Sequence, residues 1–105
     1  KPYEIRKYAD MIKSFRDKEA EKIFNLKPSR KLPQNIQVRA HRKLLMVNSA
    51  DRIDDLRNPP SNHLEKLKGD RKDEWSIKIN DQWRVCFKFD ETTGDASDVI
   101  IEDYH

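Results

Sequence analysis

The chain has 105 residues, of which 35% are hydrophobic and 39% are charged. This length fits one domain with a modest core, and the high charge argues against a large enclosed pocket. The uncharged apolar runs are too short for a membrane-spanning helix or a secretory signal. The single cysteine, Cys86, cannot form an internal disulfide, which fits a cytoplasmic protein and a structural thiol within a strand.

The net charge of +3 is unevenly distributed along the chain. Residues 1–60 contain 15 Lys/Arg against 8 Asp/Glu, whereas residues 61–105 contain 7 against 11. A basic first half suits an anionic partner, such as RNA, DNA, the ribosome or an acidic protein. Charge alone does not choose among these partners, and it is equally compatible with a solvated surface.

A short strand and a helix are predicted first, after an N-terminal segment that we exclude from the predicted fold. Residues 1–10 show weak periodicity and are interpreted as an extension or an expression remnant, leaving residues 11–105 as one domain. Residues 11–15 alternate in polarity, which predicts a short strand. Asp17 can cap a helix that follows it, and the apolar spacing after Asp17 is helical.

The clearest helix covers residues 34–49. Four apolar residues recur there at helical spacing, namely Ile36, Ala40, Leu44 and Val47. Such a stripe predicts core packing. Three cations fall on other faces of the same helix: Arg39, Arg42 and Lys43. We expect these cations to contribute a basic surface.

Two strands joined by a turn at residues 80–82 are predicted next. Trp75, Ile77 and Ile79 share one face of the first strand. One face of the second strand carries Trp83, Val85, Phe87 and Phe89, and its other face carries Arg84, Cys86 and Lys88. This alternation predicts a β-hairpin with one apolar face.

A last strand is predicted around residues 99–101, which are apolar on both faces. This strand should be central in the sheet or covered by a helix. The whole order is strand, helix, helix and three antiparallel strands. It predicts an α+β fold with two N-terminal helices packed on one face of a compact antiparallel sheet.

Several short segments occur together in an order that resembles the HigB toxins, within the RelE-like superfamily of bacterial type II toxin–antitoxin modules. They are residues 11–15 (MIKSF), 67–71 (LKGDR), 75–77 (WSI), 83–84 (WR) and 102–105 (EDYH). The resemblance covers residues 11–105. It implies the same compact antiparallel sheet with helices, and it makes Met11 the native first residue.

The resemblance also implies an activity and its partners. Such toxins are ribosome-dependent mRNA endonucleases that enter the A site of the 30S subunit and cut the exposed codon without a cofactor. A HigA-type helix-turn-helix antitoxin holds them inactive and binds operator DNA. A non-catalytic module of the same fold, binding RNA or the antitoxin, is the alternative.

The catalytic residues that the resemblance implies are Lys68, Arg84, Asp103, Tyr104 and His105. Arg84 suits a phosphate, because its guanidinium stays charged and donates two parallel hydrogen bonds. Lys68 supplies a second cation, and His105 transfers protons near neutral pH. Tyr104 stacks on a base or donates a hydrogen bond, and Asp103 orients a neighbour.

Other interpretations of the same residues remain open. Arg84 is also compatible with a plain surface cation on a strand, and residues 103–105 with a frayed terminus. Lys68 and Arg71 flank a Gly69-Asp70 pair, which also fits a tight turn with solvated charges.

One position departs from the family pattern. Some members have a histidine two residues before the leucine of the 67–71 segment, where this chain has Glu65. If the segment is extended, His63 and Glu65 lie on one side, and either residue can take part in catalysis. Glu65 fits a base or a surface carboxylate. The three histidines lack metal-ligand spacing, so no metal is predicted.

Overall fold

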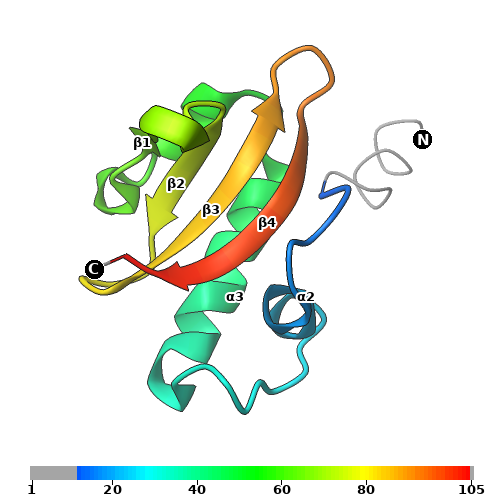
Figure 1. Cartoon of the computed structure of the whole chain (residues 1–105), viewed down its shortest axis with the longest axis vertical. Coiled ribbons are helices and arrows are strands. Elements are labelled where there is room, and N and C mark those ends of the chain that lie inside the picture. The colour runs from blue at the N-terminus through cyan, green and yellow to red at the C-terminus, as the bar shows by residue number, and fades with distance from the viewer. Residues whose placement is uncertain (1–11, 105) are drawn as a thin grey trace.

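The computed structural model describes residues 12–104; residues 1–11 and residue 105, and therefore the predicted extension at 1–10, lie outside this description. Four antiparallel strands form one sheet in the order β1-β2-β3-β4. Helices α2 and α3 both pack on one face of this sheet, against β4 and, for α3, also β3 (Figure 1). This arrangement confirms the predicted α+β class.

Helix α2 (Lys18–Phe24) begins at the predicted cap. The Asp17 Oδ1 accepts a hydrogen bond from the Ala20 backbone N–H at 3.2 Å, which satisfies one unpaired donor of the first turn. Ala20 and Ile23 are buried against the rest of the core. The helix therefore turns its apolar side inward, as its spacing predicted.

Helix α3 (Gln34–Ser49) has the predicted bounds, and all four residues of the predicted apolar stripe are buried. Arg39 and Arg42 are exposed, as expected. Lys43 is not, and the prediction of a surface cation is wrong for this residue. Its Nζ instead donates a hydrogen bond to Oδ1 of buried Asn62 at 2.5 Å.

The predicted strand at residues 11–15 is reduced to two isolated bridges within the described residues. Ile12 and Phe15 pair in parallel with Ala96 and Val99. The backbone N–H of Lys13 donates to the carbonyl oxygen of Ala96 at 2.7 Å. This segment runs along the outer edge of β4 without forming a regular strand.

The predicted hairpin is formed by β2 (Glu74–Lys78) and β3 (Trp83–Asp90). Oδ1 of Asn80 accepts hydrogen bonds from the backbone N–H groups of Gln82 and Trp83, at 2.9 and 2.8 Å, and so fixes the turn. The apolar residues of β2 and β3 on the helix-facing side join the core.

Strand β4 (Asp95–Asp103) lies at the end of the strand order. The alternative that placed residues 99–101 in a central strand is therefore wrong, and the helix-covered alternative is right. Val99 and Ile101 are buried under the helices, while Ile100 on the other face is only partly buried.

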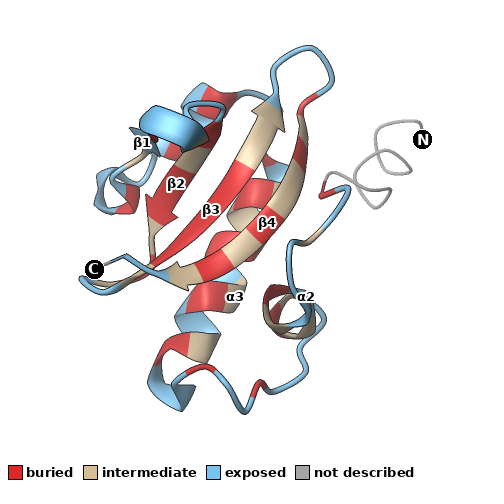
Figure 2. Ribbon diagram, viewed as in Figure 1, coloured by how far each residue is buried: buried red, intermediate tan, exposed pale blue. Residues whose placement is uncertain are grey.

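A further strand, β1 (Glu65–Lys66), was not predicted, because two residues carry no periodicity. Three 3-10 helices surround it: η1 (Ile53–Arg57), η2 (Pro60–Asn62) and η3 (Gly69–Arg71). Strand β1 extends the sheet beyond β2, and η2 contacts α3 through Asn62. Arg71 of η3 reaches Glu74 and Glu102 on the sheet face opposite the helices. Buried residues follow one another along β2 and β3 (Figure 2).

Candidate functional site

Arg84 is the centre of the candidate site. It lies on the sheet face opposite the helices, as its alternation with Trp83 and Val85 predicted. Its side chain is only 8% exposed. Nε donates to Ser76 Oγ at 2.9 Å, and Nη2 donates to the backbone carbonyl oxygens of His63 and Ser76. Arg84 is therefore a fixed, buried guanidinium, and the alternative of a plain surface cation is wrong.

Glu65 and Tyr104 complete a cluster around Arg84. Glu65 Oε1 lies 3.6 Å from Arg84 Nη1 and accepts a hydrogen bond of 3.2 Å from the Tyr104 hydroxyl. The Arg84 Cζ lies 4.9 Å from the centroid of the Tyr104 ring. Strands β1, β3 and the end of β4 thus bring together a carboxylate, a cation and a phenol.

The cluster opens to solvent on one side. The Glu65 side chain is 50% exposed and Tyr104 is 44% exposed. Burial, and then the negative charge of Glu65, raise the pKa of the Tyr104 hydroxyl, so the phenol remains a neutral donor. An anion approaching from solvent would meet Arg84 Nη1 and would compete with Glu65 for it.

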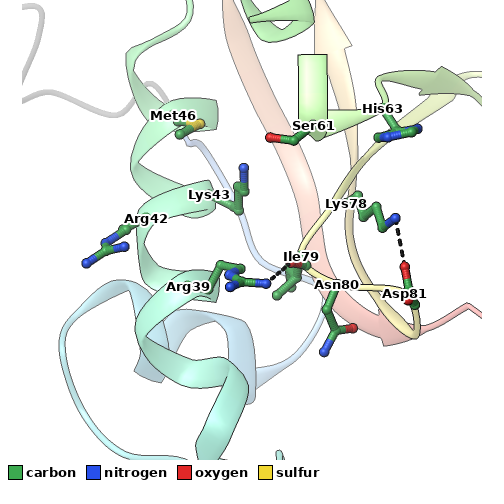
Figure 3. A pocket seen from close by; sticks show the side chains of 10 residues that line it. All are labelled: Arg39, Arg42, Lys43, Met46, Ser61, His63, Lys78, Ile79, Asn80 and Asp81. Carbon is green, nitrogen blue, oxygen red and sulfur yellow. Dashed lines mark hydrogen bonds and ion pairs between the residues drawn. The ribbon is translucent and has the colours of Figure 1, made fainter. Parts of the chain in front are cut away.

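His63 contributes differently from Glu65. Its φ of 44° places it in the left-handed region, at the end of η2 and before β1. The segment is therefore not extended at His63, so the condition under which His63 and Glu65 would lie on one side is not met. The His63 carbonyl binds Arg84, while its side chain lines a separate cavity next to the cluster (Figure 3).

Arg71 is held by two carboxylates. Its guanidinium donates two hydrogen bonds to Glu102, at 2.7 and 2.8 Å, and two to Glu74, at 2.9 and 3.1 Å. These bonds lower the pKa of both carboxyl groups, and they raise the pKa of Arg71. The interpretation of Arg71 as a solvated charge is therefore wrong, because Arg71 fastens η3 to β2 and β4.

Among the described residues 12–104, Lys68 and Asp103 make no hydrogen bond or ion pair with the cluster. Lys68 is exposed at the start of η3. Asp103 pairs with Trp83 in the sheet register, so it points away from the face of Arg84. Its Oδ2 accepts a hydrogen bond from Gln82 Nε2 at 2.8 Å. Of the five residues predicted as catalytic, the structure brings Arg84 and Tyr104 together, and His105 lies outside the described residues.

Cys86 agrees with the prediction of a structural thiol. It is fully buried between the strands, and burial raises the pKa of its thiol to about 12. A thiol with such a pKa is not an active nucleophile at neutral pH. Among residues 12–104, no three His, Cys, Asp or Glu side chains are arranged to hold a metal ion.

Sequence reasoning missed two parts of this site. Ser76 fixes the Arg84 guanidinium by accepting a hydrogen bond from Nε. The only feature of the sequence that pointed to Ser76 was its place in the strand predicted to pair with the strand of Arg84. The cavity beside His63 was also missed. It combines side chains of α3 with the β2–β3 turn, whose proximity follows from the tertiary fold and not from spacing along the chain.

Comparison with known proteins defines the class. The sequence profile of the family described as "RelE-like toxin of type II toxin-antitoxin system HigB" matches residues 13–105. Endoribonuclease HigB of Proteus vulgaris is 36% identical over 95 residues, which cover 90% of this chain and all of that protein. Toxin HigB-1 of Vibrio cholerae is 36% identical over 80 residues, covering 75% of this chain and 84% of that toxin.

A third relative, an uncharacterized protein of Haemophilus influenzae, is 40% identical over 60 residues, 57% of this chain and 59% of that protein. The fold and the profile together define a RelE-like toxin. The chain belongs to the HigB-like family of type II toxin–antitoxin systems, which confirms the resemblance seen in the sequence. Membership of such a system implies an antitoxin partner. No helix in residues 12–104 is long and apolar enough to cross a membrane.

Proposed function

We propose that this toxin is a metal-independent endoribonuclease that cleaves mRNA in the A site of the ribosome. The observation that carries the proposal is the cluster of Arg84, Tyr104 and Glu65, in which a fixed, buried cation lies directly beside an exposed carboxylate and an exposed aromatic ring. The name of the Proteus relative, an endoribonuclease, supports the same reaction.

The reaction uses the ribose 2′-hydroxyl as the nucleophile. The 2′-oxygen forms a bond to the adjacent phosphorus as its proton passes to a base, and the bond from phosphorus to the 5′-oxygen breaks as that oxygen gains a proton. The products are a 2′,3′-cyclic phosphate and a 5′-hydroxyl. Arg84 stabilises the added negative charge on the phosphoryl oxygens through Nη1, and the low exposure of Arg84 strengthens this interaction.

The remaining residues divide the proton transfers and the substrate contacts. Glu65 is a candidate for the base, because its carboxylate lies 3.6 Å from Arg84 Nη1, where the phosphate would bind. His105 is the candidate for protonating the 5′-oxygen. Tyr104 stacks on a base of the codon, and Lys68 approaches the phosphate as a second cation. Asp103 orients Gln82, with which it shares a hydrogen bond.

A HigA-type helix-turn-helix antitoxin is the proposed inhibitor, and it also carries the toxin to operator DNA. Support for a protein partner comes from apolar side chains that remain exposed on the helical layer, since Leu26 is 77% and Val38 is 68% exposed. The reaction on mRNA and the binding to the antitoxin would then use separate sides of the molecule. Co-purification with the product of the neighbouring gene tests this partner.

A non-catalytic module that binds RNA or the antitoxin is the second candidate. It is favoured by the three hydrogen bonds that Arg84 makes within the fold through Nε and Nη2, and by the ion pair between its Nη1 and Glu65. In that case Arg84 would be a structural residue that holds β1 and η2 against the sheet. Only a cleavage assay separates the two functions.

The deciding experiment compares one mRNA free in solution with the same mRNA on ribosomes that hold a defined codon in the A site. We expect cleavage only on the ribosome, with a 2′,3′-cyclic phosphate at the new end. A 2′-deoxy nucleotide on the 5′ side of the scissile bond should abolish it. Equal cleavage of free RNA would contradict ribosome dependence, and cleavage of the deoxy substrate would contradict the mechanism.

The proton-transfer role of His105 is tested in the same assay. His105→Ala should lower the cleavage rate on ribosomes by about a hundredfold or more, as expected for loss of a general acid. The thermal midpoint should stay nearly unchanged. Full toxicity of this variant in a growth assay would contradict the assignment and would transfer the role to another group.

A further inference from the structure

A cavity of about 590 Å³ lies between α3 and the β2–β3 turn, next to the Arg84 cluster (Figure 3). Four cations line it. Three of them come from α3, namely Arg39, Arg42 and Lys43, and the fourth is Lys78 at the end of β2. Among residues 12–104, Asp81 is the one carboxylate that lines the cavity, and it forms an ion pair with Lys78 at 2.9 Å. The lining therefore carries an excess of three positive charges when His63 is neutral.

The burial of Lys43 among the other cations of the cavity lowers the stability of the folded protein. Lys43 is 7% exposed, and its ammonium meets the neutral Asn62 side chain instead of a carboxylate. Burial, and then the charge of Arg39, lower the pKa of Lys43. Within residues 12–104, no carboxylate forms an ion pair with Arg39, Arg42 or Lys43. Lys43 is therefore a buried cation whose charge an anion in the cavity would compensate.

The position of the cavity identifies the anion. Lys78 is the cross-strand partner of Arg84, so the two residues lie side by side in the sheet. His63 joins the two sites, because its carbonyl oxygen binds Arg84 while its ring lines the cavity. A strand of RNA with its reacting phosphate at Arg84 would therefore bring a neighbouring phosphate group to the cavity.

We propose that this cavity is a second phosphate site, which binds a backbone phosphodiester of RNA near the scissile bond. The proposal deepens the proposed function and rests on it. Arg39 and Arg42 contact the phosphate oxygens, and Lys43 provides a fixed positive charge at the base of the cavity. The phosphate belongs either to the mRNA or to ribosomal RNA, and both sources present the same chemistry. Backbone contacts of this kind position a strand without selecting its sequence.

The test measures binding separately from cleavage. The probes are a fluorescent 2′-O-methyl RNA hexamer, which cannot be cut, and vacant ribosomes without mRNA. The pocket variant is Arg39→Gln/Arg42→Gln. The control is Arg30→Gln/Lys31→Gln, which removes the same charge from two exposed residues outside the cavity. A second control, Arg39→Lys/Arg42→Lys, changes both side chains but keeps their charge. The thermal midpoint of each variant shows whether a loss of binding comes from a loss of folding.

We expect the pocket variant to bind one probe roughly tenfold more weakly, the loss that one charge-assisted contact predicts. The slope of log affinity against log salt should also fall by about 0.7 for each lost phosphate contact. The control should change binding by less than about twofold, and the lysine variant should recover most of the loss. A loss with the hexamer assigns the phosphate to mRNA, and a loss with vacant ribosomes alone assigns it to ribosomal RNA.

Two results would overturn the proposal. One is parental binding of both probes by the pocket variant, and the other is an equal loss in the control variant, which would reduce the cavity to general surface charge. Because these readouts do not involve cleavage, their failure is distinguishable from failure of the proposed function. If the parent toxin cleaves mRNA on ribosomes and the pocket variant binds both probes like the parent, the second phosphate site is rejected and the proposed function stands.

Discussion

The sheet face that meets the helices and the opposite face, which carries Arg84, are buried by different kinds of side chain. The helix-facing side packs Ile77, Val85 and Phe87 against α3 with no polar group among them. The opposite side buries Ser76 and Arg84 in a network of hydrogen bonds. One face therefore supplies stability through apolar burial, and the other fixes charged groups in place.

This difference bears on the function that we propose for Arg84. An apolar interface can repack around a changed side chain, whereas a buried hydrogen-bond network holds each member in one geometry. Arg84 needs such support, because a guanidinium contributes most when it is already oriented toward the charge that develops. If the two faces differ in energy as they do in composition, substitutions on each face should change stability by different amounts.

The largest effect on stability is expected on the apolar face. Leu44 is fully buried, so Leu44→Ala should lower the free energy of unfolding by about 2–5 kcal/mol. Leu45, its neighbour in α3, is 43% exposed and serves as the control, with an expected loss below about 1 kcal/mol for Leu45→Ala. Chemical denaturation measures both. Similar losses in the two variants would mean that α3 is not packed as described.

A smaller effect is expected where Arg71 ties η3 to the polar face. Arg71→Gln removes charge-assisted hydrogen bonds to Glu74 and Glu102 and should lower the free energy of unfolding by about 2 kcal/mol. The loss is smaller than for a fully buried ion pair, because Arg71 is partly exposed to solvent. Lys72→Gln, at an exposed neighbour, should be close to neutral. Equal stability of both variants would contradict a structural role for Arg71.

The pH dependence sharpens the Arg71 test. Arg71 lowers the folded-state pKa of Glu74 and Glu102, so their contribution is fully present above the unfolded value of about 4.3. It is lost as the pH falls through the lowered folded values. The stability difference between the parent and Arg71→Gln should therefore be constant between about pH 6 and pH 8 and should shrink below about pH 4. A difference that grows in acid would contradict the assignment.

The smallest effect is expected at the solvent side of the cluster. Tyr104→Phe removes only the hydroxyl that donates to exposed Glu65, so the free energy of unfolding should change by less than about 0.5 kcal/mol. Tyr104→Ala also removes the ring beside Arg84 and should cost more. Thermal unfolding of the two variants makes the comparison. A large loss in Tyr104→Phe would mean that the hydroxyl is part of the buried network.

Periodicity predicted the apolar face well, since the stripe from Ile36 to Val47 and the alternation of β2 and β3 are properties of neighbouring residues. The polar face was predicted poorly because its contacts join distant positions. Arg71 binds Glu102 across 31 residues, and Arg84 binds the carbonyl oxygen of His63 across 21. No local pattern encodes such pairs. Of the site, the sequence predicted Arg84, Tyr104 and Glu65, but not the cavity that adjoins them.

The central claim is that Arg84 acts on the phosphate through a fixed guanidinium and not through charge alone. Arg84→Lys keeps the charge but loses the two-pronged donor, and lysine cannot reproduce both contacts to Ser76. Lys88→Gln, which removes a cation from the same face of β3, is the control. Each variant is first checked for folding and for parental binding to ribosomes.

The measurement is the single-turnover rate of mRNA cleavage on saturating ribosomes. We expect Arg84→Lys to lower this rate by about a hundredfold, in line with loss of a charge-stabilising donor, and Lys88→Gln to stay near the parent. A folded Arg84→Lys variant that cleaves within about twofold of the parent rate would contradict the role of the fixed guanidinium, because a lysine would then supply all that the reaction requires of Arg84.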